Sequence, residues 1–175
     1  MNPDTYRIPL DTAHHILSTF GITHPTRAYG RWVKAGGFDL KDFGSVLFES
    51  PLVFIIDWRS PLDEALETVS RTLDRLGVSL QVELDEEGDS GFVSCGSDGR
   101  AAVSYGPDDD DFDDVLRALQ TVVPGDIEVR ASPWNEGSDT WVYAALPRVE
   151  WNALESVSSE AVKHLFRSLP PKRNS

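Results

Sequence analysis

The sequence predicts an α+β protein: a single domain over residues 1–169, built from a mainly antiparallel β-sheet with helices packed on one face. Some segments repeat apolar residues at helical spacing, and others alternate apolar and polar residues as strands do. Consecutive strands joined by short turns pair as antiparallel neighbours. The expected order is an N-terminal helix and a strand pair, followed by helix, three strands, helix, two strands and helix.

The first 60 residues are expected to form a short helix and a pair of strands. Asp11 caps the helix and Gly21 ends it, and its apolar positions are Leu10, Ala13, Leu17 and Phe20. Residues 22–45 contain a proline and several glycines, which favour irregular structure with one helical turn. Val46–Phe48 and Leu52–Trp58 are the predicted strands. The second is almost entirely apolar, which predicts a central strand covered on both faces.

The clearest helix follows Ser60, which caps it from outside. Pro61 suits the first helical position, and Asp63 completes a pattern that resembles a capping box. Gly77 ends the helix in a left-handed conformation. The apolar stripe that faces the core consists of Leu62, Ala65, Leu66, Val69, Leu73 and Leu76.

Three strands are predicted after this helix. Val78–Leu84 alternates apolar and polar residues, which indicates a strand with one face in water. Phe92–Cys95 and Ala101–Tyr105 flank the sequence Gly96-Ser97-Asp98-Gly99, whose Asp-Gly pair suits a hairpin turn. We therefore expect these two strands to pair antiparallel.

The last third of the chain predicts a helix, two strands and a final helix. The first of these helices places on one side Phe112, Val115, Leu116, Leu119 and Val122. Ile127–Ala131 and Thr140–Leu146 form the strand pair. The final helix extends from Trp151 to Leu165, and serines in its middle weaken it and can break it. Residues 170–175 are expected to be a flexible tail.

Negative charge is concentrated in the middle of the chain. The sequence has 16 Lys and Arg against 29 Asp and Glu, a formal charge of −13. Residues 61–146 carry 5 basic and 20 acidic groups, a balance of −15, whereas residues 1–60 balance to 0 and residues 147–175 to +2. Two clusters stand out: Asp85, Glu86, Glu87 and Asp89 in the first, and Asp108, Asp109, Asp110, Asp111, Asp113 and Asp114 in the second.

These clusters predict a surface that binds a basic partner protein. A helix N-terminus stabilises nearby carboxylates, which accounts for one or two aspartates of the second cluster. The others repel one another and lower folding stability, so helix capping alone does not explain them. We predict that both clusters steer and contact the partner, with Trp134 as an aromatic anchor. The alternatives are a solvated face without a partner and, for Trp134, a packing role. Neither cluster has the ligand spacing of a calcium loop.

No motif in the chain predicts catalysis or a cofactor. The lone Cys95 excludes a disulfide framework and is expected to be a small buried hydrophobe. His14 and His15 point about 100° apart on a helix, so they are not expected to bind one metal ion. The glycines do not form a phosphate-binding loop. We therefore expect a protein that is not an enzyme, with no cofactor and no metal.

Membranes and nucleic acids are not among the expected partners. Met1–Leu10 lacks the apolar stretch of a signal peptide, and the longest apolar run, Leu52–Ile56, is too short to cross a bilayer. These features predict a cytoplasmic protein. Arg27–Lys34 interleaves cationic and aromatic residues as single-strand binders do, but the negative net charge disfavours contact with phosphates.

In size, acidity and lack of a catalytic motif, the chain resembles the immunity proteins of bacterial polymorphic toxin systems. The resemblance lies in composition, so it transfers no residue roles. It implies a protein that binds and blocks a cognate toxin by covering a basic surface of it with an acidic face.

Two further functions remain open. Between Pro61 and Leu169 the expected element order resembles that of type III secretion chaperones, which are small, acidic and usually dimeric proteins that hold effector segments partly extended. The 60 residues in front of Pro61 depart from that plan. The run of aspartates also suggests a nucleic-acid mimic that occupies a DNA-binding site.

Overall fold

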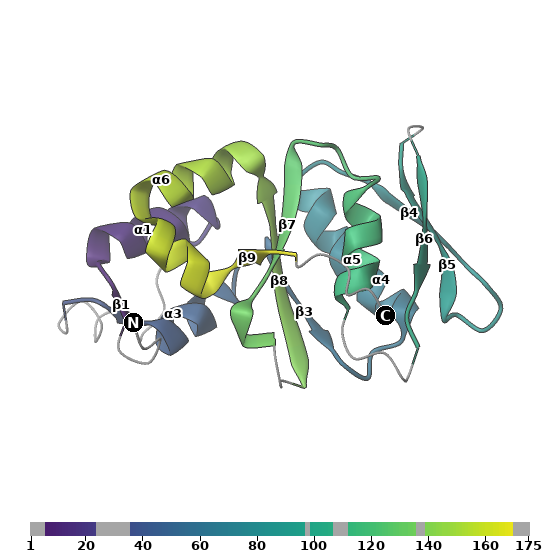
Figure 1. Ribbon diagram of the computed structural model, residues 1–175, viewed down its shortest axis with the longest axis horizontal. Coiled ribbons are helices and arrows are strands. Elements are labelled where there is room, and N and C mark those ends of the chain that lie inside the picture. The colour runs from purple at the N-terminus through teal and green to yellow at the C-terminus, as the bar shows by residue number, and fades with distance from the viewer. Residues whose placement is uncertain (1–5, 24–35, 97–98, 107–111, 136–138, 170–175) are drawn as a thin grey trace.

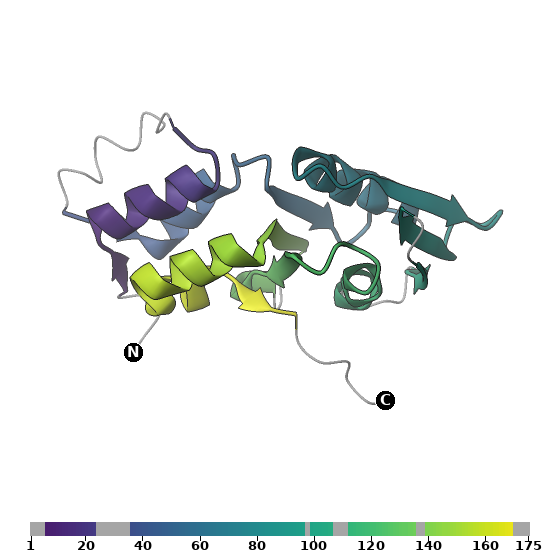
Figure 2. The ribbon, with the colours of Figure 1, turned by 90° about the horizontal axis from the view of Figure 1, so that it is seen from above.

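Helices and strands of the computed structural model stack in four alternating layers, which Figures 1 and 2 show from the front and from above. The structure describes residues 6–23, 36–96, 99–106, 112–135 and 139–169. Three helices form the first layer: α1 (Leu10–Thr19), α3 (Leu40–Leu47) and α6 (Arg148–Leu165). A four-stranded sheet is the second layer, two further helices are the third, and a three-stranded sheet closes the stack.

The four-stranded sheet separates two hydrophobic cores. Its strands, in spatial order, are β3 (Val53–Asp57), β8 (Thr140–Pro147), β7 (Ile127–Ala131) and β9 (Arg167–Ser168), all paired antiparallel. Successive side chains of a strand point to opposite faces. One core therefore receives Trp141, Tyr143 and Ala145 from β8, and the other receives Val142, Ala144 and Leu146.

The second core lies under the first helical layer. It is closed at its outer end by a two-stranded ladder of β1 (Arg7–Ile8) and β2 (Phe38–Asp39). Phe20, at the end of α1, packs against the rings of Trp151 in α6 and Phe166, with ring centroids 5.9 and 5.6 Å apart. Aromatic contacts thus join the N-terminal and C-terminal segments of the chain.

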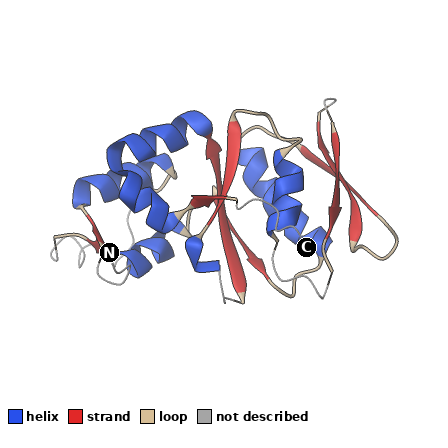
Figure 3. Cartoon of the chain, viewed as in Figure 1, coloured by secondary structure: helices blue, strands red, loops and turns tan. Residues whose placement is uncertain are grey.

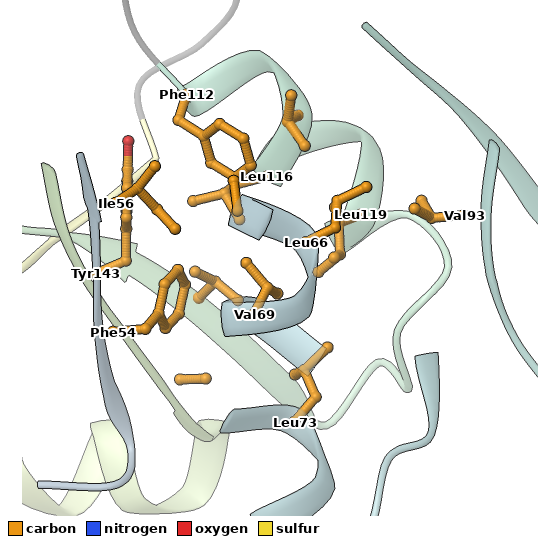
Figure 4. Close-up of a cluster of buried hydrophobic side chains, with 14 of the residues drawn as sticks. Phe54, Ile56, Leu66, Val69, Leu73, Val93, Phe112, Leu116, Leu119 and Tyr143 are labelled. Carbon is orange, nitrogen blue, oxygen red and sulfur yellow. The ribbon is translucent and has the colours of Figure 1, made fainter. Parts of the chain in front are cut away.

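The first core lies between the two sheets. Helices α4 (Leu62–Arg75) and α5 (Asp113–Gln120) form its middle, and the outer sheet consists of β4 (Leu80–Leu84), β5 (Ser90–Cys95) and β6 (Arg100–Ser104) in that order. Figure 4 shows the helix side chains in contact with both walls. The labelled residues include Phe54 and Tyr143 on the central sheet, Leu66 and Leu116 on the helices, and Val93 on the outer sheet.

A charged network fixes α6 on the central sheet. The Arg130 guanidinium lies in ion pairs with Glu128 at 2.9 Å and Glu155 at 2.5 Å, and 4.4 Å from the ring centroid of Trp151. The Trp151 indole N–H donates to the Glu128 carbonyl at 3.0 Å. Because Arg130 is buried, these partners compensate for the loss of its hydration.

The predicted α+β class is confirmed, and so are its clearest elements. The helix after Ser60 forms as α4, although no side chain caps it, and Gly77 has the expected positive φ of 75°. The predicted hairpin forms between β5 and β6. The serine-rich middle of α6 is broken, because Ser158 has extended dihedral angles within the helix. The predicted tail 170–175 and the segment Arg27–Lys34 lie outside the described residues.

Several predicted details are wrong. Asp11 does not cap α1, because the helix begins at Leu10 and Pro9 occupies the cap position. Val46 and Leu47 belong to α3 and not to a strand, because residues 40–47 place their apolar side chains at helical spacing. Strand β3 is an edge strand and not a central one, since β8 takes the central place and leaves Ile55 42% exposed. Helices cover the central sheet on both faces and not on one. The reason is that α3, which precedes β3 in the chain, and α4, which follows it, pack on opposite faces of the sheet. Figure 3 makes this alternation of helices and strands visible.

No helix in the described ranges is long and apolar enough to span a membrane.

Shortening a side chain between the two sheets should cost far more stability than shortening one on the surface. Leu66 is fully buried in α4, so we expect Leu66→Ala to lower the free energy of unfolding by about 2 to 5 kcal/mol. Val157 is exposed on α6, and Val157→Ala should change it by less than about 0.5 kcal/mol. Urea denaturation followed by circular dichroism measures both. Equal losses would contradict the layered core.

Candidate protein-binding site

The first acidic cluster forms the tight loop between β4 and β5. The Asp85 N–H donates to the Ser90 carbonyl at 2.9 Å and closes the ladder. The Gly88 N–H donates to one Asp85 carboxylate oxygen at 2.7 Å, and the Ser90 hydroxyl donates to the other. Gly88 has a φ of 81°, a conformation that a residue with a Cβ rarely adopts. Asp85 therefore holds the shape of the loop.

These hydrogen bonds also set the charge of the loop. The Ser90 hydroxyl, and after it the Gly88 N–H, lower the pKa of the Asp85 carboxyl below its ordinary value of 3.8. The cause is that both donors favour the ionised form. Asp85 thus stays negative over a wider range of pH than an aspartate without such donors.

The other carboxylates of the cluster point into water. Glu86, Glu87 and Asp89 are exposed, and within the part of the chain that the structure describes their carboxylates form no hydrogen bond or ion pair. In Figure 1 this loop lies at the right edge of the molecule, beyond the outer sheet. A loop with fixed backbone and unpaired carboxylates is suited to contact a cationic surface.

Tyr105 connects the first cluster to the start of α5. Its N–H donates to the Asp89 carbonyl at 2.9 Å, and its ring packs edge-to-face on Phe112, with centroids 5.2 Å apart. Phe112 directly precedes α5 and is fully buried. The structure therefore brings the flanks of the two acidic clusters together at one end of the outer sheet.

The described aspartates of the second cluster have internal partners. Asp113 is buried and accepts a hydrogen bond from the Tyr143 hydroxyl at 2.9 Å, with Arg117 3.9 Å away. Asp114 forms an ion pair with Arg117 one turn further along α5. Both stand in the first turn, where the helix dipole favours a carboxylate. We assign them a role in the fold and leave them out of the contact surface.

Two predicted components of the site lie outside the described residues. Asp108, Asp109, Asp110 and Asp111 belong to the undescribed segment 107–111. Trp134 has a described backbone, in a short 3-10 helix at Pro133–Asn135, but not a described side chain. The proposed roles of these residues therefore remain predictions from the sequence.

Trp58 is an exposed aromatic residue that the sequence did not single out. It directly follows β3, its side chain is 43% exposed, and the Arg59 guanidinium lies 4.6 Å from its ring centroid. The Tyr105 hydroxyl donates to the Trp58 carbonyl at 2.9 Å. Tyr105 thus connects Trp58 to the acidic loop. In the sequence Trp58 lies close to an apolar run, separated from it by Asp57, and nothing local distinguishes it from a buried residue.

Groups that carry chemistry are not gathered at this end of the molecule. The described residues contain no group of three or more His, Cys, Asp or Glu side chains that could hold a metal ion. Burial raises the pKa of the Cys95 thiol, which disfavours the reactive thiolate. The geometry of the site thus offers charge and an aromatic side chain for binding.

Comparison of the chain with protein-family models, with curated proteins and with solved structures found no match.

The pKa of Asp85 should depend on its neighbour across the loop. Ser90→Ala removes the largest cause of the lowered pKa, so we expect the Asp85 pKa to rise. A carboxylate with a lowered pKa stabilises the folded state above its unfolded pKa, and this contribution disappears as the pH falls through the folded value. A carboxyl-carbon NMR titration measures the shift. Ser94→Ala, on the same strand, should leave the titration unchanged; an equal shift in both variants would contradict the assignment.

Proposed function

We propose that this protein is a non-enzymatic binding protein that covers a basic surface of a partner protein. The observation that carries the proposal is the loop of Glu86, Glu87 and Asp89, exposed and unpaired on a backbone fixed by Asp85. Such a function is that of an immunity protein toward its toxin, the class that the chain resembles in size and acidity. Toxins that act on nucleic acids present basic sites, which an acidic loop complements.

Charge at this loop acts mainly on the rate of association. Carboxylates that are exposed to water attract a cationic surface over about one Debye length, roughly 8 Å at physiological ionic strength. Steering of this kind raises association rates by about tenfold or more and weakens steeply with added salt. The rigid loop avoids the loss of conformational entropy that a flexible acidic tail would suffer on binding.

Trp58 is the aromatic side chain best placed to add affinity to this encounter. Tryptophan and arginine are enriched among the residues that dominate binding energy, and Trp58 carries Arg59 on its ring. A partner that covers the ring would bury its remaining exposed surface. The acidic loop would orient the partner, and Trp58 would slow its dissociation.

Secretion chaperone is the second candidate, and the observed element order favours it. From α4 to α6 the helices and strands follow in the order α4, β4, β5, β6, α5, β7, β8 and α6, with the short strand β9 after them. Apart from β9 and a short 3-10 helix before β8, this order resembles that of type III chaperones. Those proteins are usually dimers. Light scattering that shows a strict monomer would count against this candidate and would leave the toxin inhibitor unaffected.

Neutralising the loop should slow the capture of a basic partner. With the product of the neighbouring gene as the partner, we expect Glu86→Gln with Glu87→Gln to reduce the association rate by about tenfold at low salt and to flatten its salt dependence. Stopped-flow fluorescence at a series of salt concentrations measures both quantities.

The matched control removes the same charge elsewhere. Glu49, after α3, and Glu150, on α6, are exposed. In Figure 1, α3 and α6 lie on the other side of the central sheet from the acidic loop. Glu49→Gln with Glu150→Gln should leave the association rate within about twofold of the wild type. Equal effects of the two double variants would show that net charge, and not the loop, attracts the partner.

A further inference from the structure

The register of the outer sheet directs one row of main-chain groups of β4 away from the sheet. The Asp85 N–H donates to the Ser90 carbonyl on β5. In an antiparallel ladder every second residue faces the same neighbouring strand, so the main-chain groups of Glu83 and Gln81 also face β5. The N–H and C=O groups that point outward belong to Leu80, Val82 and Leu84. No hydrogen bond engages them among the residues that the structure describes.

The other sheet edges are less open. On β3, the Val53 N–H donates to the Ser50 carbonyl at 3.1 Å, and the Asp57 carbonyl accepts from the Ser60 N–H at 2.9 Å, so the chain closes both ends of that edge. On β6, the inward-facing Val103 is only 4% exposed and lies under α5. Among the residues that the structure describes, strand β4 has neither kind of cover.

The side chains on the inner face of β4 form a row of partly exposed apolar residues beside this edge. Val82 faces the helical layer but is 38% exposed, whereas Val93, its direct partner on β5, is 1% exposed. Leu80 and Leu84 on the same face are half-buried. The layer of α4 and α5 therefore covers the middle of the outer sheet and stops short of its β4 edge. One more strand would bury Val82 and complete the layer.

The opposite face of β4 is polar, and the loop that follows the strand is acidic. Glu83 is exposed and pairs with Arg100 across the sheet at 2.7 Å. The strand leads directly into the acidic loop of Glu86, Glu87 and Asp89. A second copy of this chain carries the same charge of −13, so two copies would repel one another. Charge complementarity selects an occupant with basic side chains.

We propose that the open edge of β4 accepts an extended segment of the partner protein as a fourth strand of the outer sheet, one that alternates apolar and basic residues. The apolar side chains cover Val82 between Leu80 and Leu84, and the basic ones lie beside Gln81, Glu83 and the acidic loop. Main-chain hydrogen bonds supply affinity, and the alternation selects the sequence. This inference deepens the proposed function, on which it rests for the charge of the partner.

A peptide that alternates lysine and valine over about nine residues, the span of one strand with flanks, is the probe for this edge. We expect it to bind the wild-type protein by fluorescence anisotropy. Val82→Pro removes an outward N–H and fills the edge without breaking a bond to β5. This variant should weaken binding of the peptide by at least about tenfold. Val82→Lys, which keeps the backbone and repels the peptide, should also weaken it.

Two controls separate the edge from the rest of the sheet. The Tyr105 N–H donates to the Asp89 carbonyl, so the main-chain groups of Ala102, three residues before Tyr105, point away from β5. Ala102→Pro therefore places a proline on the free edge of β6, at a position equivalent to Val82 on β4. Peptide binding by this variant should stay within about twofold of the wild type. The same peptide methylated at all of its main-chain nitrogens has no N–H donor on either edge and should not bind. Circular dichroism of each variant confirms folding.

Several outcomes would overturn the inference. These are no binding of the peptide to the wild-type protein, equal binding of the methylated peptide, or binding that neither substitution of Val82 reduces. A wild-type dimer that Val82→Pro dissociates would show that the occupant is a second copy. The Glu86 and Glu87 double variant can slow association with the whole partner while Val82→Pro leaves the affinity for that partner unchanged; the proposed function then stands and the edge proposal fails. If neither variant changes the association rate or the affinity, both proposals fail.

Discussion

Burial of both faces of β8 is the constraint on which the rest of the structure depends. From Trp141 to Leu146 every residue of this strand is buried, and alternate side chains supply one wall to each core. A strand of this kind needs a neighbour on each edge and a helical layer on each face. The chain provides them from distant segments, with β3 and α4 from its first half and β7, α5 and α6 from its second. The layered order follows from that one requirement.

The same packing divides the carboxylates of the acidic segment into two kinds. Asp113 is drawn into the first core by the Tyr143 hydroxyl, and Asp114 is held by Arg117, so these charges stabilise the start of α5. Asp85 is used to shape its loop. Among the described residues of the two clusters, the carboxylates that remain unpaired belong to Glu86, Glu87 and Asp89, and folding does not use them. The proposed function in binding would explain why the chain tolerates their mutual repulsion.

The two sheets differ in how completely they are covered, and the proposed binding surface follows from this difference. Helices on both faces and a charged network under α6 seal most of the central sheet. The outer sheet has one helical layer of two helices, which reaches Val93 and Val103 but leaves Val82 exposed. An edge strand with exposed apolar side chains favours aggregation unless it is protected. In the proposed function, the acidic loop at the end of β4 attracts a basic segment, and the net charge of −13 disfavours association of two copies.

Local sequence patterns predict correctly the elements that depend on residues close together in the chain. Helix α4, the hairpin of β5 and β6, the strand pair of β7 and β8, and the break at Ser158 all follow from local periodicity, turn residues and helix propensity. Only the tertiary structure decided that β3 lies at an edge, that Trp58 is exposed and that Asp113 is buried. Each of these depends on which segments, far apart in the chain, lie against the residue, and no local pattern encodes that. The composition of Leu52–Trp58 is the same whether the strand has a neighbour on both of its edges or, as here, on one.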